Sequence, residues 1–418
     1  MFALTERALQ IMKGQSFSTP VDLLDNIFPE VYAYGQKITS NPNLRKTFAL
    51  NALVGTDNAA WLLYAKENGF TTFDQMIPKA YQPALSNHHS EVAAIPLMAY
   101  NIPINEIQAA VEQGYFFMKI KIGQPGTQEE MLEKDKEIEA VYIATDAPSH
   151  VRLCIASLKR GLHVVSAVPA VFGVEQLEFA DELLATVKKT GLIYALNETS
   201  AFRSQCYAMR EIDKAGGFGK MIYTEGEYFH YMPEPIGSYK EWRVGLPPQY
   251  YPTHSNAFYT CVTGGTFTDV SCLAMPSLLA AFQPGKNRYG NRFATEVALF
   301  RTSEGGMARM AVGWDMPGVG GEKGRVYGQK GCYEERYSGL ADLSKVSQDK
   351  PQLPPKMSPG GHGGSHGYLT DDFITAILLN RKPCVDVACA LNTTVPGIIA
   401  HQSALKGGET LKIPQYTL

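Results

Sequence analysis

One stretch of the sequence limits the possible fold more than any other. Residues 140–196 alternate regularly between short apolar runs and amphipathic runs with helical spacing. The pattern predicts three strands and two helices, at 140–145, 149–160, 163–167, 174–190 and 192–196. Strands that alternate with helices in this way form a parallel sheet with right-handed crossovers. The stretch therefore predicts part of an α/β domain of the kind that binds dinucleotides.

The residues that follow these strands are candidates for a binding site. Ligands of open α/β sheets gather at the carboxyl ends of the strands, so side chains there can reach a common ligand. For Asn197, an ordinary turn asparagine is an equally good interpretation. We expect contacts to a bound cofactor from Thr145, Asp146, Pro148, His150, Pro169 and Asn197.

The usual phosphate-binding turn is missing. Dinucleotide-binding folds hold the pyrophosphate on a G-x-G-x-x-G turn after the first strand, and this sequence contains no such run. The corresponding place is NIPIN, residues 101–105, where Pro103 stands instead of glycine. Proline has no backbone N–H, and bulky neighbours keep the backbone away from a phosphate. We therefore expect any dinucleotide to bind weakly.

Other parts of the chain have different patterns. Longer strand-like segments at 219–232 and 291–316 favour an antiparallel sheet. Helices are expected at 367–382 and 392–408, and residues 1–90 are expected to be mainly helical. The predicted fold class is α/β: a partial Rossmann-like parallel sheet, followed by an α+β domain with a large, mainly antiparallel sheet.

Composition narrows the range of partners. A net charge of −3 and a pI of about 6.3 give no reason to expect nucleic acid or a membrane as a partner. Seven cysteines, without a C-x-x-C pair, indicate free thiols and a cytoplasmic protein. His362 and His366 have a spacing that could suit a metal, but their glycine-rich surroundings favour a loop, so no metal is expected.

Several motifs in residues 137–418 resemble the Gfo/Idh/MocA family of NAD(P)-dependent oxidoreductases. AVYIATDAPSH is similar to the family's strand, cofactor loop and helix start, and KRGLHVVSAVPA to its next strand. YALNETSAFR and GKMIYTEGEY resemble later strands, and YYPTHS resembles the branch that includes NAD-dependent glycosidases. The resemblance implies NAD or NADP as cofactor, hydride transfer at a sugar or cyclitol hydroxyl, and a homo-oligomer formed through the C-terminal sheet.

The resemblance also implies which residues react, although two family positions differ. Ala167-Val168-Pro169 stands where the family has Glu-Lys-Pro, so the usual proton-transfer lysine is absent. Leu273 replaces the histidine of the family's Asp-x-x-x-His pair, which would begin at Asp269. We expect His254 to transfer the proton instead, since a histidine titrates near neutral pH, and Tyr251 to assist it. The alternative is a hydrogen-bonded histidine beside a turn.

Two further residues are candidates for substrate binding. Glu227 and Tyr228 lie on a predicted sheet strand, where they would reach sugar hydroxyls. The alternative for both residues, which we favour, is a solvated edge of the sheet.

Residues 45–136 resemble another family, the mandelate-racemase branch of the enolase superfamily. FALNALVGTDNAAWLLYA is similar to the helical part of its capping domain, and residues 95–135 to its first two β/α units. Lys119-Ile-Lys121 matches the family's K-x-K, whose second lysine is often a base. The alternative, which we favour because no metal ligands follow, is a solvated or paired lysine on a strand. This resemblance adds a helical enolase-like N-terminal segment to the expected fold.

The two resemblances divide the chain into three expected domains: 1–136, 137–200 and 201–418. They leave three functional hypotheses open. The first is a Gfo/Idh/MocA-type oxidoreductase, and the second is an enolase-type acid/base enzyme, a sugar-acid dehydratase or epimerase, that uses Lys121. The third is a non-catalytic fusion that keeps a sugar pocket.

Overall fold

The computed structural model describes residues 2–77, 79, 82–83, 97–98, 104–114, 119–120, 138–318, 320–355 and 357–418. The chain divides into two compact units, Met1–Leu97 with Gln113–Lys119, and Met98–Glu112 with Ile120–Leu418. The short strands β1 (Leu97–Met98) and β2 (Lys119–Ile120) pair with each other. Lys121 lies outside the described residues.

The first unit is helical, as expected for the N-terminal residues that the structure describes. Its helices are α1 (Phe2–Met12), α2 (Pro20–Thr39), α3 (Lys46–Glu67) and α4 (Phe73–Met76). Thr19 and Asp22 form a capping box at the start of α2, which satisfies backbone N–H groups of the first turn. Leu4, Ile27 and Leu53 come from three different helices and form the core of a small bundle.

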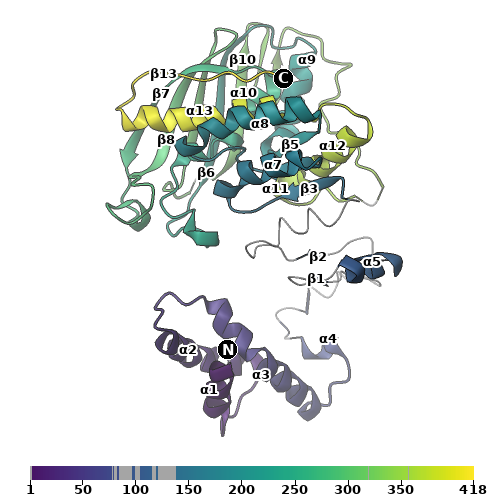
Figure 1. The fold of residues 1–418 in the computed structure, drawn as a ribbon, viewed down its shortest axis with the longest axis vertical. Coiled ribbons are helices and arrows are strands. Elements are labelled where there is room, and N and C mark those ends of the chain that lie inside the picture. Colours follow the sequence, from purple (N-terminus) through teal and green to yellow (C-terminus); the bar gives the residue numbers. More distant parts are fainter. Residues whose placement is uncertain are drawn as a thin grey trace. The chain divides into compact units, whose positions relative to one another are not determined.

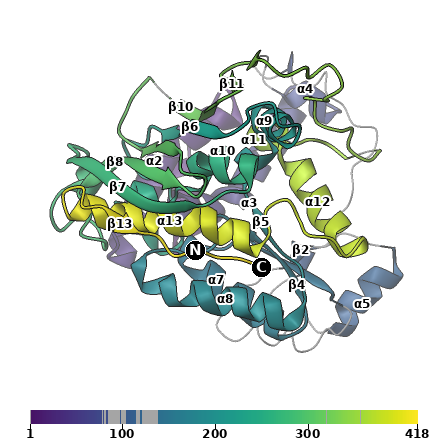
Figure 2. The ribbon, with the colours of Figure 1, turned by 90° about the horizontal axis from the view of Figure 1, so that it is seen from above.

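The second unit contains the predicted parallel sheet. Strands β3 (Ala140–Ile143), β4 (His163–Ala167) and β5 (Tyr194–Asn197) lie in this order and are parallel. Helices α7 (His150–Lys159) and α8 (Leu177–Thr190) cover one face, and α12 (His366–Leu378) packs on the other through Phe373 (Figure 2). The predicted strands and helices of 140–196 are thus confirmed, with ends that shift by at most three residues.

The second sheet is large and mainly antiparallel, as predicted. Within the described residues its eight strands have the order β12-β11-β10-β6-β9-β8-β7-β13, and only β6 and β9 pair in parallel (Figure 1). The strands are β6 (Met221–His230), β7 (Phe267–Pro276), β8 (Phe293–Thr302), β9 (Met307–Gly313), β10 (Gly320–Gly328), β11 (Gly331–Tyr333), β12 (Tyr337–Gly339) and β13 (Leu411–Lys412).

The second unit has further helices among its described residues. They are α5 (Ile104–Glu112), α9 (Ser204–Lys214), α10 (Thr253–Thr263), α11 (Gly361–Gly364) and α13 (Val387–Leu405). Short 3-10 turns are η2 (Ala147–Ser149), η3 (Val174–Gln176), η4 (Thr199–Phe202), η5 (Tyr239–Glu241), η6 (Pro248–Tyr250) and η7 (Ala280–Phe282). The predicted helix at 392–408 therefore starts five residues earlier, at Val387.

Helix α10 lies unusually close to the large sheet. Gly226 of β6 and Gly324 of β10 are register partners, and the helix packs over both. A Cβ at Gly226 would lie 2.0 Å from the carbonyl oxygen of Ser255, and one at Gly324 would lie 2.1 Å from the Phe258 ring. The two glycines therefore allow the helix to approach the sheet backbone directly.

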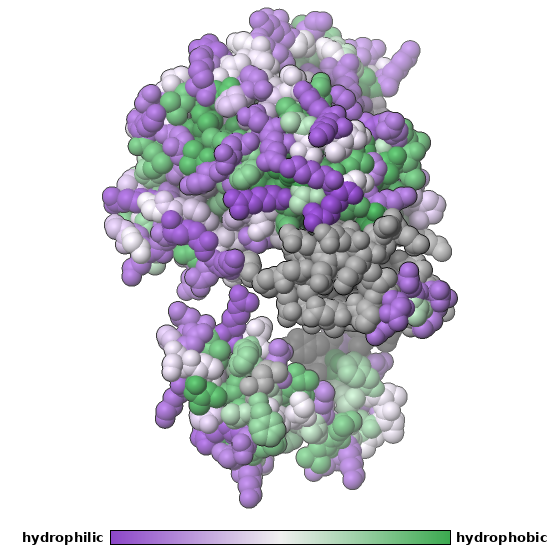
Figure 3. All heavy atoms as spheres, viewed as in Figure 1, coloured by the Kyte–Doolittle hydropathy of each residue, from purple (hydrophilic) through white to green (hydrophobic). Residues whose placement is uncertain are grey.

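Among the described residues, no helix is both long enough and apolar enough to cross a bilayer. Hydrophobic and hydrophilic side chains are interspersed over the face of each unit that Figure 3 shows.

Candidate active site

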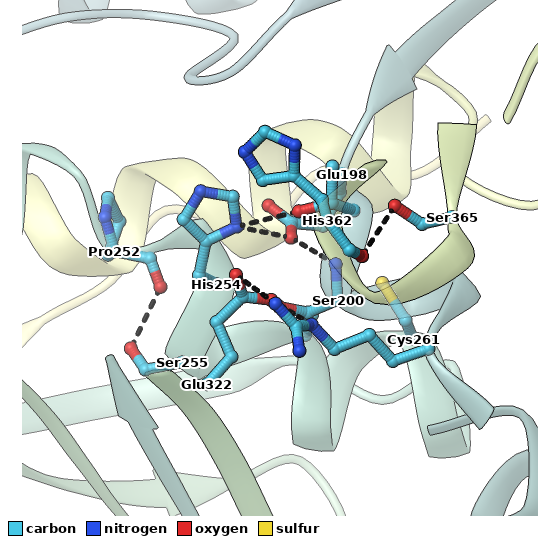
Figure 4. Close-up of polar contacts among 12 residues, drawn as sticks. Glu198, Ser200, Pro252, His254, Ser255, Cys261, Glu322, His362 and Ser365 are labelled. Carbon is cyan, nitrogen blue, oxygen red and sulfur yellow. Dashed lines mark hydrogen bonds and ion pairs between the residues drawn. The ribbon is translucent and has the colours of Figure 1, made fainter. Parts of the chain in front are cut away.

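The site is built around a buried pair of His254 and Glu198. His254 lies in the first turn of α10, not in a loop as its sequence context suggested, because the chain becomes helical directly after Pro252. Its Nδ1 lies 2.7 Å from Oε1 of Glu198, the residue that follows β5 (Figure 4). His254 is 5% exposed and Glu198 is not exposed at all, so solvent hardly screens this pair.

The two partners favour each other's charged form. Burial alone would lower the pKa of His254, but the Glu198 carboxylate raises it above the ordinary value. Burial alone would raise the pKa of Glu198, but the His254 charge lowers it below its usual range. The backbone N–H of Ser200 also donates to Glu198 Oε1, over 2.8 Å. The arrangement thus stabilises an imidazolium held by a carboxylate.

The pair makes stability depend on pH in a predictable direction. The raised pKa of His254 means that its charge stabilises the fold fully below about pH 6.5, the unfolded value. This stabilisation is lost as pH rises through the folded pKa. The lowered pKa of Glu198 stabilises the fold above about pH 4.3, the unfolded value, and this stabilisation is lost as pH falls through the folded pKa. Glu198→Gln should therefore cost most stability between these values.

Urea unfolding at about pH 5.5, inside this window, and at about pH 9, above it, measures this difference. We expect Glu198→Gln to lose clearly more stability at the lower pH. Glu182→Gln is the control, because its pair with Lys159 is exposed and contributes little. An equal loss at both pH values would show that the Glu198 charge does not stabilise His254.

Aromatic side chains form a wall beside the pair. The Tyr228 ring centre lies 4.6 Å from that of His254, and the Tyr251 ring centre lies 5.5 Å from it. Burial raises the pKa of both tyrosines, so their phenols stay protonated at neutral pH and can donate hydrogen bonds. Arg243 stacks over Trp242 at 4.2 Å and over Tyr251 at 5.4 Å. Aromatic faces with hydroxyl and guanidinium donors suit a sugar ring.

Glu227, the other substrate-binding candidate, lies elsewhere. Successive strand residues point to opposite faces, so Tyr228 faces α10 while Glu227 faces away. Glu227 forms an ion pair with Arg309 of β9. Glu227 and Tyr228 therefore lie on opposite faces of the sheet, and substrate binding by Glu227 stays a prediction. The edge interpretation was wrong, because β6 lies between β10 and β9.

The predicted cofactor residues meet at one edge of the parallel sheet. Thr145 and Pro169 follow β3 and β4, and Asn197 is the last residue of β5; the carboxyl ends of the three parallel strands lie together. Asn197 is the residue next to Glu198, and its side-chain amide donates to the Tyr142 hydroxyl. Hydroxyl and amide groups at this edge fit the nicotinamide-ribose half of a dinucleotide. Residues 101–103, where the pyrophosphate half would be held, lie outside the described residues.

His150, Asp146 and Pro148 make local contacts within this edge. The His150 ring lies 3.1 Å from the Pro169 carbonyl oxygen and 3.2 Å from that of Thr145, so it joins the two loops. Burial lowers its pKa, which favours the neutral ring. Asp146 accepts from the Ser149 hydroxyl, and the Pro148 carbonyl accepts from Gln176. These contacts shape the loop that a cofactor would touch.

Three groups at the site, Glu198, Glu322 and His362, were not placed there from the sequence. Glu198 was not singled out, although it follows Asn197 directly. Glu322 of β10 lies near His254, as does His362 of α11 (Figure 4). His362 contacts His366 over 2.7 Å, and burial and that second ring lower the pKa of His362. No cluster of three or more metal-ligating side chains occurs in the part of the chain that the structure describes.

Asp269, the first residue of the family's Asp-x-x-x-His pair, forms ion pairs on the large sheet. Its carboxylate lies 3.5 Å from both Arg301 and Lys412 and accepts from Thr268. Leu273, where the family has its histidine, is 64% exposed on β7.

Comparison with known proteins agrees with this geometry. Residues 43–198 match the Gfo/Idh/MocA model, an oxidoreductase family with an NAD-binding Rossmann fold. The chain is 24% identical over 329 residues to a glycosyl hydrolase family 109 protein of Solibacter usitatus, covering 69% of this chain and 73% of that protein. It is 26% identical over 126 residues to a 1,5-anhydro-D-fructose reductase of Ensifer adhaerens, covering 30% and 36%.

A solved structure shows the same fold. Levoglucosan dehydrogenase in complex with NADH and L-sorbose superimposes with a TM-score of 0.57 and 15% identity, covering 77% of this chain and 90% of that one. The family match includes all of residues 45–136, so the enolase resemblance of that segment is not supported. We therefore correct that expectation: the segment matches part of the model of an NAD-binding oxidoreductase family.

Proposed function

We propose that the chain is an oxidoreductase of the Gfo/Idh/MocA type, whose model residues 43–198 match, and that it transfers a hydride between NAD or NADP and the hydroxyl-bearing carbon of a sugar or cyclitol. The observation that carries this proposal is the buried His254–Glu198 pair, which lies next to Asn197 at the cofactor edge. A redox step at a carbinol needs a group that exchanges the hydroxyl proton. His254 is the group best built for it.

In this proposal His254 is the catalytic acid/base. Its Nδ1 is engaged by Glu198, so proton exchange with the substrate occurs at Nε2. During oxidation the neutral ring accepts the hydroxyl proton, and Glu198 stabilises the imidazolium that results; during reduction the imidazolium returns the proton. Tyr251 and Tyr228 donate hydrogen bonds to substrate hydroxyls.

Cofactor binding is assigned to the strand-end loops. Bound NAD would supply the nicotinamide carbon that accepts or gives the hydride. We assign contacts with its nicotinamide-ribose half to the edge formed by Thr145, Asp146, Pro148, Pro169 and Asn197. His150 acts behind them, because both of its ring nitrogens already contact carbonyl oxygens of these loops.

A second candidate is cleavage of a glycosidic bond. Its support is the relative from Solibacter usitatus, which is named as a glycosyl hydrolase. The same His254–Glu198 pair could exchange protons in such a reaction. Neither proposal uses Lys121, since nothing observed favours the enolase-type alternative.

The test is a panel of free sugars, cyclitols and aryl glycosides with NAD or NADP. We expect the absorbance of the reduced nicotinamide to rise with at least one free sugar or cyclitol, and a carbinol deuterium to appear in the cofactor. Release of the aryl group without net cofactor reduction would favour the glycosidase candidate. Activity with neither class would favour a non-catalytic protein that keeps a sugar pocket.

We also propose that the chain forms a cytoplasmic homo-oligomer through the outer face of the large sheet. Leu273, Leu299 and Met307 are each more than half exposed on this face. Glu225 and Arg309 are partners on the same face, so a second copy could pair opposite charges. Leu299→Glu should lower the mass measured by light scattering, and an unchanged mass would exclude this interface.

A further inference from the structure

A second charged pair lies beside the catalytic histidine. Glu322 of β10 and Arg203, which follows η4, form a two-point ion pair, with distances of 2.7 Å from Nε to Oε2 and 2.9 Å from Nη2 to Oε1. The Glu322 side chain is 5% exposed and that of Arg203 is 28% exposed. A carboxylate that is this buried and held at both oxygens has a fixed position.

Hydrogen bonds connect this pair to the catalytic histidine. The Ser200 hydroxyl donates to Glu322 Oε2, and the Ser200 backbone N–H donates to Glu198 Oε1. Glu198 Oε1 in turn contacts His254 Nδ1 (Figure 4). One residue, Ser200, therefore joins two buried carboxylates, and the connection runs between elements more than a hundred residues apart in sequence.

We propose that Arg203 and Glu322 are positioning residues for His254: they fix the segment that carries Glu198 and balance the charge around the imidazole ring. This inference rests on the proposed role of His254. Neither residue needs to touch the substrate, since both act through Ser200 and Glu198 or through their charge.

The charge balance has a definite sign. Burial disfavours the imidazolium, the negative charges of Glu198 and Glu322 favour it, and the positive charge of Arg203 opposes it. Loss of the Glu322 charge leaves Arg203 unopposed, whereas loss of Arg203 leaves Glu322 unopposed. The side chains that face His254 from the packed elements are Glu198, Glu322, Arg203, Tyr228, Tyr251 and His362.

The test is the pKa of His254, read by NMR from labelled histidine in the full chain and assigned with His254→Gln. We expect Glu322→Gln to lower this pKa and Arg203→Met to raise it, because the two changes remove opposite charges. Arg203→Lys should return it toward the wild-type value. A structural defect alone would not move the pKa in opposite directions.

Turnover provides a second measurement. Both variants should lower kcat more than they raise KM, by up to about a hundredfold, since small misplacements of a catalytic group can cost this much. Ser200→Ala keeps the Arg203–Glu322 pair and cuts one connection, so it should lower kcat with little change in the His254 pKa. If the charge variants fail to fold, the kcat of Ser200→Ala still tests the connection between Glu322 and Glu198.

Glu225→Gln is the matched control, because Glu225 pairs with Arg325 on the opposite face of the same sheet. It should leave the His254 pKa unchanged. The proposal is overturned if Glu322→Gln and Arg203→Met leave that pKa unchanged or shift it in the same direction. Because the NMR measurement needs no turnover, a chain that transfers no hydride would defeat the proposed function without deciding this inference.

Discussion

Replacing His254 with alanine is expected to lower kcat by about 10²–10⁴-fold, the usual contribution of a positioned acid or base. The affinity for the nicotinamide cofactor should change little, because the proposed cofactor contacts come from the loops after β3, β4 and β5. Steady-state kinetics with the substrate found in the panel, together with titration of the cofactor, separates the two effects.

The structure provides a matched control for this variant. His401 forms a second buried pair with a carboxylate, at 2.7 Å from Glu296, and it lies on α13. His401→Ala should therefore cost stability in a similar way while retaining far more turnover. If His254→Ala weakens cofactor binding as much as it lowers kcat, His254 shapes the pocket and is not the proton-transfer group.

The parts of the fold that could be predicted are those with a local signal. Strands β3, β4 and β5 with helices α7 and α8 have clear apolar periodicity, and their bounds were predicted within three residues. Helix α10 was not predicted, because every residue from Thr253 to Val262 is buried. A helix buried on all sides has no polar face and hence no amphipathic pattern to detect.

The order of the strands in the large sheet could not be predicted from the sequence. The large sheet places β6 between β9 and β10, which lie some eighty to a hundred residues further along the chain. Such pairing depends on contacts made only in the folded protein, such as the approach of α10 to Gly226. Strand alternation alone places Glu227 and Tyr228 on opposite faces, but only the strand order shows that β6 is an interior strand and not an edge.

Some residues of the candidate site could be predicted from local sequence, and others could not. His254 and Tyr251 were found through a motif, and Asn197 through its position at the end of a strand. Glu322 lies on a strand in a run of glycines and charges, and nothing local marks it as a neighbour of residue 254. Only the register of β10 with β6, which pairs Glu322 with Tyr228, brings it to the site.

Binding of NAD or NADP is expected to be weak, with a dissociation constant near millimolar where an intact relative would be micromolar. The sequence has Pro103 where a glycine turn would place backbone N–H groups at the pyrophosphate. Charge-assisted hydrogen bonds of that kind contribute about 1.5–3 kcal/mol each. Loss of two of them lowers affinity by about a hundred- to ten-thousandfold.

Calorimetric titration of the purified chain with each dinucleotide measures this affinity. Pro103→Gly should bind more tightly than the wild type, because it restores a backbone donor and lets the backbone approach the phosphates. Pro148→Ala is a control for changes at a proline of the nicotinamide side, and it should not strengthen binding. A wild-type dissociation constant below about ten micromolar would contradict the prediction, because loss of the two hydrogen bonds should make binding much weaker than that. It would mean that other residues hold the pyrophosphate.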